Sequence, residues 1–220
     1  MLSENLESII SQLEELTVSL FPEILNIYED KDFKTTHKKD GSPVTKADML
    51  GHKLILKFLT KHYPNIPVVS EESFEQKGYK PAKQFWIVDP IDGTKEFVNR
   101  SGEFTTNIAL IQNGSPVLGV VGAPALNKVW SGIATKQQSL ALPKKATLAG
   151  NDNAKLKIVM SKSHRTVVDT AFLSYLDKNN VKISIMSKGS SLKICALADN
   201  KADIYPRFGP TSEWDIAAAD

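Results

Sequence analysis

The stretch from Trp86 to Phe97, WIVDPIDGTKEF, decides how this chain is interpreted. An apolar run leads into two carboxylates three residues apart, Asp89 and Asp92, and then into a Gly-Thr turn. Acidic oxygens fixed at the end of a strand suit hard divalent cations such as Mg²⁺. If the turn opens a helix, its amides can hold a phosphate oxygen. The pattern therefore indicates a metal-assisted phosphoryl-transfer site.

The composition is that of a globular protein with balanced charge. Its 220 residues, 41% of them hydrophobic, can form a sizeable core in one large or two small domains. The net charge is +2, which argues against binding to nucleic-acid polymers, because such proteins normally carry a strongly basic patch. No apolar run approaches the roughly 18 residues of a transmembrane segment. Residues 1–20 contain no continuous apolar signal-peptide core.

The single cysteine, Cys195, excludes an internal disulfide framework and fits a reducing compartment. It lies in an apolar stretch without a nearby base, so we expect an inert core residue rather than a catalytic thiol. We therefore expect a cytoplasmic protein, with a peripheral position at the inner face of the cell membrane as the alternative.

Two helices are expected in the first part of the chain. Apolar residues at helical spacing between positions 6 and 20 predict a helix with Ser3 as its N-cap, which Pro22 kinks or ends. Thr45 is expected to cap a second helix that runs to about His62.

Strands and further helices follow, separated by turn signals such as Asn113-Gly114, which indicates a hairpin. In the second part of the chain, the expected elements follow in the order strand, helix, strand, helix, strand, which is typical of α/β layering. We divide the chain into an N-terminal α+β half (1–135), a variable connection (136–155) and a C-terminal α/β half (156–220). The expected strands are 66–69, 85–88, 105–112, 117–121, 129–134, 157–160, 182–186 and 202–205, and the expected helices of the second half are 167–176 and 191–198.

The segment Asp-Pro-Ile-Asp-Gly-Thr (89–94) resembles the core motif of the inositol monophosphatase superfamily of Mg²⁺-dependent, Li⁺-sensitive phosphatases. Three other segments occur in the order of that family: GSPVTKAD (41–48), VSEES (69–73) and EWDIAAA (213–219). The resemblance covers essentially the whole chain and implies an αβαβα layered sandwich with the active site between its halves. Because family members continue past the Trp-Asp motif, we expect the C-terminal half to be incomplete at Asp220.

The resemblance implies a set of metal ligands for two or three Mg²⁺ ions. Asp89 would bridge two ions and Asp92 would bind one of them, together with the backbone carbonyl of Ile91. Glu71 would be a further ligand, and Asp215 would approach from the second half. Asp48 resembles a residue near a third, weaker ion.

Each of these residues also has an ordinary structural interpretation. Asp92 could cap the helix that follows it, and Asp215 could be the N-cap of a terminal helix. Asp48 could be a first-turn acid favoured by the helix dipole. Chemistry alone does not distinguish Glu71 from its neighbour Glu72.

The family resemblance also implies the reaction. Glu71, Thr94 and Asp48 are the expected catalytic residues, with a water shared between a metal and Thr94 deprotonated with help from Glu71 and attacking phosphorus in line. The amides of Gly93, Thr94 and Lys95 would hold the phosphate, and no phosphoenzyme is expected. In the alternative class of haloacid-dehalogenase-like phosphatases, Asp89 would instead be a covalent nucleophile.

Lys95-Glu96-Phe97, GSSLK (189–193) and YPRFGP (205–210) resemble the CysQ-type 3′(2′),5′-bisphosphate nucleotidases. Cationic and hydroxyl donors there suit a second phosphate. The implied substrate is adenosine 3′,5′-bisphosphate, a by-product of sulfate activation, which would yield AMP. A homodimer is compatible with the family. The expected substrate-binding residues are Gly93, Thr94, Lys95, His164, Ser190, Ser191, Lys193, Arg207 and Asp215.

Two other functions stay open at this point. The first is an inositol-1-monophosphatase-like sugar or polyol phosphatase, which would use the same metal site with a different substrate pocket. The second is a truncated, non-catalytic nucleotide-binding chain.

Overall fold

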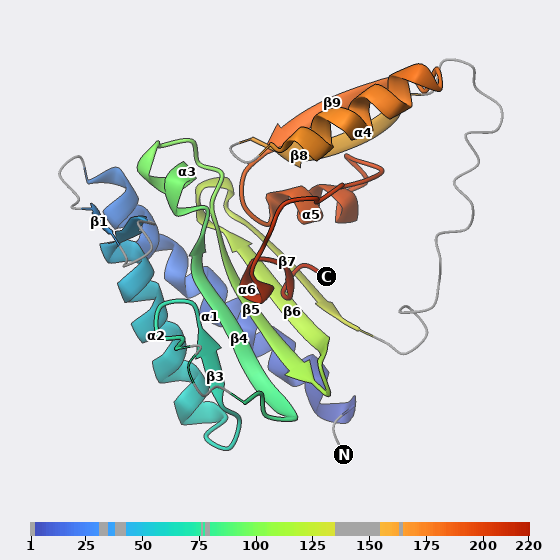
Figure 1. Cartoon of the computed structure of the whole chain (residues 1–220). Helices are drawn as coiled ribbons and strands as arrows, with labels where there is room; N and C mark the ends of the chain where they lie inside the picture. The colour runs from blue at the N-terminus through green and yellow to red at the C-terminus, as the bar shows by residue number, and fades with distance from the viewer. Residues whose placement is uncertain are drawn as a thin grey trace.

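The computed structural model describes residues 3–30, 35–37, 43–75, 77, 80–134, 155–162 and 165–220. Five layers follow one another in the order helix, sheet, helix, sheet, helix (Figure 1). The αβαβα sandwich expected from the sequence is therefore confirmed. The layers consist, in turn, of α1 (Ser3–Glu29) with α2 (Lys46–His62), a five-stranded sheet, α5 (Leu192–Ala198) with α6 (Glu213–Ile216), a two-stranded sheet, and α4 (Val167–Lys178).

The large sheet has the strand order β3-β4-β5-β6-β7, in which only β3 and β4 are parallel. Its central strand β5 is buried along nearly its whole length. Asn113 and Gly114 connect β5 to β6 with φ angles of 53° and 80°, so the expected hairpin is confirmed. The strands are β3 (Val68–Ser70), β4 (Gln84–Asp92), β5 (Thr105–Gln112), β6 (Ser115–Ala123) and β7 (Lys128–Ile133).

The first helix continues through Pro22 to Glu29, so the expected end at this residue is wrong. Pro22 itself is exposed, and Val18, four residues earlier, is 52% exposed. The carbonyl that loses its helical partner therefore faces water, where it can be satisfied. Leu20 and Ile24 are buried in the main core and hold both sides of the proline against the sheet.

The small sheet pairs β8 (Leu156–Ser161) in parallel with β9 (Ile183–Lys188). Ile158 and Met160 pack against α4, while Val159 packs against α5, as the two-residue period of a strand requires. The strand expected at 202–205 is reduced to a single bridge between Ile204 and Ile158.

The bridge is short because side-chain chemistry interrupts the ladder. The Asp203 carboxylate accepts a hydrogen bond from the amide of Lys157 at 2.7 Å, and Pro206 has no amide to donate. A short hairpin of β1 (Thr35–His37) and β2 (Pro43–Thr45) precedes α2 and has no counterpart among the strands expected from the sequence.

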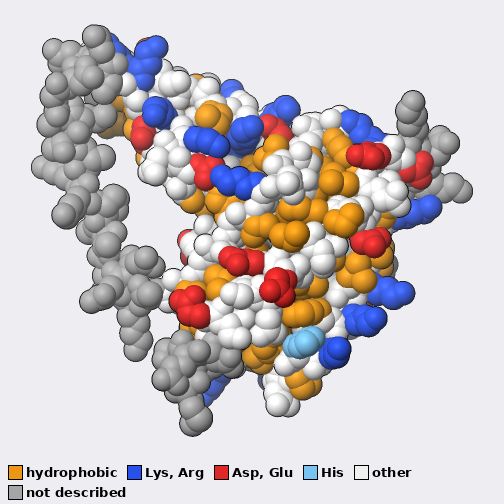
Figure 2. Space-filling view, turned by 180° about the vertical axis from the view of Figure 1, so that it is seen from behind, with side chains coloured by type: hydrophobic (Ala, Val, Ile, Leu, Met, Phe, Trp, Pro, Cys, Tyr) orange, Lys and Arg blue, Asp and Glu red, His pale blue; other side chains and the backbone are white. Residues whose placement is uncertain are grey.

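The face seen from behind carries mixed charge (Figure 2). Lysine and arginine side chains lie mainly around its rim and alternate with acidic ones, so this face presents no continuous basic surface for a polynucleotide. Among the described helices, none is both long and apolar enough to cross a membrane. Most of the expected variable connection, residues 135–154, lies outside the described residues, and the division into two halves stays a prediction.

Candidate active site

The site begins where β4 ends. The pairing of β4 with β5 shifts in register between Asp89 and Asp92, and Gly93 follows with a φ of +88°. A side chain at Gly93 would be strained at this angle and would meet the Ser190 side chain at 3.1 Å. The chain therefore turns directly from the strand into a short helix, α3 (Thr94–Val98), so the Gly-Thr turn does open a helix.

Three carboxylates meet at this strand end. Asp89 and Asp92 from β4 and Asp215 from α6 each offer an oxygen within 4.8 Å of the others. Sequence positions more than a hundred residues apart thus converge, as the resemblance implies. In the described part of the chain this is the group that could hold a metal ion.

Backbone groups hold each carboxylate in place. Oδ1 of Asp89 accepts a hydrogen bond from the Ile91 amide at 3.1 Å in an Asx turn. Oδ2 of Asp92 accepts from the amide of Ser191 at 2.6 Å. Oδ2 of Asp215 accepts from the Ser212 amide at 3.1 Å. Because Oδ1 of Asp92 and Oδ1 of Asp215 accept no hydrogen bond from a described residue, each leaves one oxygen for a ligand.

Asp215 does not cap α6 as an N-cap, which corrects one structural interpretation. Ser212 is the N-cap, and Asp215 stands three residues later in a capping box. Thr211 adds a hydroxyl that donates to Asp215 Oδ2 at 2.9 Å. The helix start therefore orients the carboxylate, and its structural and metal-binding roles are compatible.

The carboxylates repel one another in a buried position. Burial raises the pKa of Asp89 well above its usual range, and repulsion from Glu71, Asp92 and Asp215 adds to it. Burial, with repulsion from Asp215, also raises the pKa of Asp92 to about 6, although Lys193 and the Ser191 hydrogen bonds oppose the shift. A divalent cation relieves this repulsion, and carboxylate oxygens are the ligands that Mg²⁺ prefers, so the donor set fits that ion.

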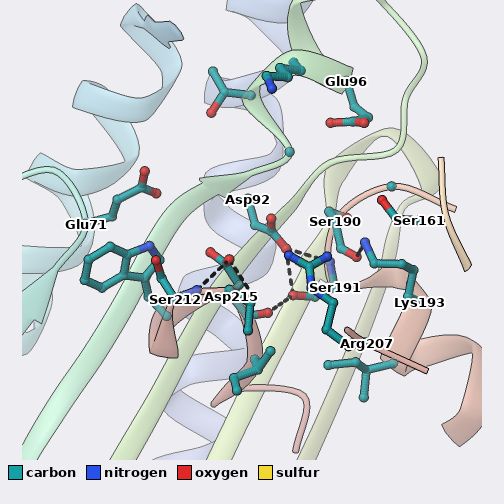
Figure 3. A pocket seen from close by; sticks show the side chains of 18 of the residues that line it. Glu71, Asp92, Glu96, Ser161, Ser190, Ser191, Lys193, Arg207, Ser212 and Asp215 are labelled. Atoms are coloured by element: carbon teal, nitrogen blue, oxygen red, sulfur yellow. Dashed lines mark hydrogen bonds between the residues drawn. The ribbon is translucent and has the colours of Figure 1, made fainter. Parts of the chain in front are cut away.

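Glu71 lies on the turn after β3, where its amide donates to the Val88 carbonyl at 3.0 Å. Its carboxylate is close enough to Asp89 to raise the pKa of that residue, although it is not one of the three clustered acids. Glu71 lines the pocket and Glu72 does not, which favours the first glutamate of the pair. Figure 3 shows Glu71 across Asp92 and Asp215 from Lys193.

Thr94 and Asp48 contact each other behind the cluster. The Thr94 hydroxyl lies 3.2 Å from Asp48 Oδ1 and 3.1 Å from the Ile91 carbonyl. Asp48 Oδ2 accepts from the amide and hydroxyl of Thr45 at 2.7 and 2.6 Å, closing the capping box of α2. Burial raises the pKa of Asp48. Asp48 is thus both the first-turn acid and the residue that orients Thr94, and it lies outside the carboxylate cluster.

The wall of the pocket away from Glu71, here called the cationic wall, carries Lys193 and Arg207 and also the carboxylate of Glu96 (Figure 3). The cavity has a volume of about 340 Å³ and is lined by Glu71, Asp92 and Asp215 and by Lys95, Ser190, Lys193 and Arg207. Lys193 is buried, and its Nζ donates to the Ser190 carbonyl at 2.5 Å. Burial lowers the pKa of Lys193, repulsion from Arg207 contributes, and attraction to Asp92 opposes the shift.

Two predicted substrate ligands have protein partners in the structure. The Arg207 guanidinium donates to the carbonyls of Gly209 at 3.3 Å and Pro210 at 2.5 Å. These hydrogen bonds hold the backbone of residues 207–210 in a turn around the arginine side chain. The amide and hydroxyl of Ser191 both contact Asp92 Oδ2, at 2.6 and 2.8 Å. Ser191 is only 2% exposed, so the structure gives it the role of support for Asp92.

Helix α5 is anchored at both ends. Ser191 precedes its first residue, and Asp199 follows its last. Asp199 accepts from Lys128 at 2.7 Å and from the Trp130 indole at 2.9 Å, both on β7. These hydrogen bonds keep the pKa of Asp199 well below its usual range. The helix that carries Lys193 is therefore fixed to the large sheet.

Cys195 is buried in α5, and burial raises the pKa of its thiol to about 12. The expectation that Cys195 is a core residue is confirmed. His164 lies outside the described residues, so its expected place near a nucleotide stays a prediction.

Sequence reasoning missed two residues that connect the halves. Asn107 on β5 donates to the Ser191 hydroxyl at 2.8 Å. Glu103 accepts from Lys188 at 3.1 Å and from the Gly189 amide at 3.3 Å. An amide directly before the apolar run 108–111 of an expected strand is a usable signal for Asn107, whereas nothing in the loop sequence marks Glu103.

A sequence profile of the inositol monophosphatase family matches residues 5–220. The chain is 42% identical over 199 residues to the 3′(2′),5′-bisphosphate nucleotidase CysQ of Salmonella typhimurium, which covers 89% of this chain and 78% of the relative. The crystal structure of CysQ from Bacteroides thetaiotaomicron is 35% identical with a TM-score of 0.75, covering 96% of this chain and 84% of that one. An IMPase/NADP phosphatase complexed with Mg²⁺ and phosphate shares the fold at 20% identity and a TM-score of 0.71, covering 98% and 78%.

Proposed function

Because this chain belongs to the inositol monophosphatase family, we propose that it is a Mg²⁺-dependent phosphatase that removes the 3′-phosphate of adenosine 3′,5′-bisphosphate to give AMP. One observation carries the proposal: Asp92 and Asp215, two of the three clustered acids, line the same pocket as the cations Lys193 and Arg207. The nucleotidase name of the Salmonella relative supports this substrate class.

The acids Asp89, Asp92 and Asp215 are the residues that would hold the metal, with Glu71 and the Ile91 carbonyl beside them. Bound Mg²⁺ supplies Lewis-acid polarisation and neutralises charge on the phosphoryl oxygens. Two or three ions and inhibition by Li⁺ are part of this proposal, by resemblance to the family.

Glu71 and Thr94 act on the attacking water in this mechanism. The Glu71 carboxylate accepts the proton of the water whose oxygen attacks phosphorus. Thr94 orients that water through its hydroxyl, which Asp48 and the Ile91 carbonyl hold. The bond between phosphorus and the ribose oxygen breaks, and the departing oxygen takes a proton from solvent.

The cationic wall binds the second phosphate. Burial is the main cause of the lowered pKa of Lys193, and repulsion from Arg207 adds to it. An anion between them relieves this repulsion in the same way that a cation relieves the acid cluster. Lys95, Ser190 and the amides that open α3 add donors around the pocket. A substrate with two phosphates would contact both the metal-binding acids and the cationic wall, whereas a sugar monophosphate would contact the metal-binding acids only.

The same proposal includes the metabolic role and the cellular compartment of the enzyme. Its substrate would be a by-product of sulfate activation, and its compartment the cytoplasm, where the single buried thiol stays reduced. A homodimer is compatible with this function and is not required by it.

Phosphate release from adenosine 3′,5′-bisphosphate and from inositol 1-phosphate, measured side by side with Mg²⁺ and again with added Li⁺, tests the proposal. We expect a strong preference for the nucleotide and suppression by Li⁺. Preference for the inositol ester would be compatible with the proposed metal site but would contradict the role of the cationic wall in binding a second phosphate. Absence of turnover on both would contradict the proposed activity itself.

A further inference from the structure

Asn107 is a buried amide in the middle of an apolar strand. Its side chain is 1% exposed, and its neighbours on β5 include Ile108 and Ala109, which are fully buried. Oδ1 of Asn107 accepts no hydrogen bond from any described residue. A buried acceptor without a donor destabilises a fold, so an apolar side chain of the same size would suit this position better for stability alone.

The donor side of the same amide is fully engaged. Nδ2 lies 2.8 Å from the Ser191 hydroxyl, 3.4 Å from the Trp214 carbonyl and 3.5 Å from Asp92 Oδ2. One side chain on β5 therefore contacts the end of β4, the start of α5 and the start of α6. These are the elements that carry or support Asp92 and Asp215.

The hydroxyl of Ser191 has one proton to donate, and it lies 2.8 Å from Asp92 Oδ2 and 2.7 Å from the Asp215 carbonyl. Because Asn107 donates to this oxygen, the hydroxyl proton must point toward one of those two acceptors. Without the amide, both acceptors remain, but the Ser191 oxygen loses the donor that fixes its position between them.

We propose that Asn107 is a positioning residue of the metal site: it fixes the Ser191 hydroxyl, which contacts the carboxylate of Asp92 and the backbone carbonyl of Asp215, and thereby sets how these two residues lie relative to each other. The amide touches neither the substrate nor the reacting atoms. The inference rests on the metal site of the proposed function and is independent of which phosphate ester is the substrate.

Asn107→Leu tests this role, because leucine has the same number of side-chain heavy atoms and the same branching at Cγ, and it has no donor. The orphaned acceptor disappears with the amide, so we expect the melting temperature without metal to stay within a few degrees of wild type or to rise. Affinity for Mn²⁺, measured by titration calorimetry as a stand-in for Mg²⁺, should fall roughly 10- to 100-fold, the usual effect of losing a residue that orients metal ligands.

Thr105→Val is the matched control on the same strand. Thr105 is also fully buried, and its hydroxyl has no partner among the described residues. This variant removes a polar atom from β5 without touching Ser191, so its Mn²⁺ affinity should equal that of wild type. Unchanged Mn²⁺ affinity in Asn107→Leu, or an equal loss in Thr105→Val, would overturn the proposal.

A double-mutant cycle separates positioning from general loosening of the fold. If Asn107 acts through the Ser191 hydroxyl, Asn107→Leu combined with Ser191→Ala should weaken Mn²⁺ binding no more than the stronger single variant. Fully additive losses would contradict that route. Asn107→Ala takes the place of the leucine variant if the latter does not fold.

The Mn²⁺ affinity also tests this inference separately from the proposed phosphatase activity. A wild-type protein that binds Mn²⁺ tightly but releases no phosphate from adenosine 3′,5′-bisphosphate would overturn the activity and leave the role of Asn107 testable. A wild-type protein that binds no Mn²⁺ would overturn both.

Discussion

Asp92→Asn should stabilise this protein when no metal is present. In the fold, the pKa of Asp92 is about 6, against an ordinary value of 3.8. The ionised carboxylate is therefore disfavoured by the folded state, mainly because it is buried and secondly because Asp215 repels it. Asparagine removes the charge and keeps an oxygen that can accept the hydrogen bonds of Ser191.

The magnitude follows from the difference in pKa. About two pKa units at 1.36 kcal/mol each amount to about 3 kcal/mol at pH 8, as an upper limit. In a chain of this size that corresponds to a rise in melting temperature of roughly 6–12 °C. The loss of folding free energy caused by the ionised Asp92 in wild type is absent below pH 3.8. It grows between pH 3.8 and about 6 and is complete above that range.

Thermal melts in EDTA from pH 5 to pH 8 measure this effect. Asp169→Asn is the matched control with the opposite sign, because hydrogen bonds from Thr166 lower the pKa of Asp169. That variant should melt below wild type by a constant amount from pH 5 to pH 8, because the contribution of Asp169 is lost only when the pH falls below its ordinary pKa of 3.8. The reasoning would be refuted if Asp92→Asn melted below wild type at pH 8 without metal.

Three further outcomes follow from the same geometry. Glu71→Gln should lower kcat by roughly 10²- to 10⁴-fold in steady-state assays, because the glutamine cannot accept a proton; near-wild-type turnover would remove Glu71 from the mechanism. Lys193→Ala should raise KM for adenosine 3′,5′-bisphosphate far more than for a nucleoside monophosphate, about 10-fold or more for a lost charged hydrogen bond; equal effects on both esters would exclude the second-phosphate role. Mg²⁺ affinity, measured by calorimetry, should weaken as the pH falls below about 6, because Asp92 then takes up a proton that competes with the ion. A Mg²⁺ affinity that does not change from pH 5 to pH 8 would contradict this prediction.

Local chemistry explains which parts of the structure could be predicted from the sequence. The Gly93 turn, the Thr45 cap and the Asn113-Gly114 hairpin each depend on residues within a few positions of one another. The convergence of Asp89, Asp92 and Asp215 could be expected only through the family resemblance, because spacing alone does not bring positions so far apart together.

Packing over long distances explains the rest. Pro22 is tolerated inside α1 because its exposed side of the helix faces water, which depends on where the sheet lies. Ser191 was expected to bind substrate, yet its hydroxyl contacts Asp92 and Asn107, which are 99 and 84 positions away. The competition between a substrate and a protein partner for one hydroxyl cannot be resolved before the tertiary contacts are known.

The position of a bound metal tests the central claim most directly. A crystal of the protein prepared with Mn²⁺ should show anomalous density between the carboxylates of Asp89, Asp92 and Asp215, the acids whose oxygens lie within 4.8 Å of one another. Such a peak, lost in crystals of Asp92→Asn, is the result that our account predicts. Mn²⁺ density elsewhere, or none at this cluster in a protein that hydrolyses the bisphosphate, would contradict it.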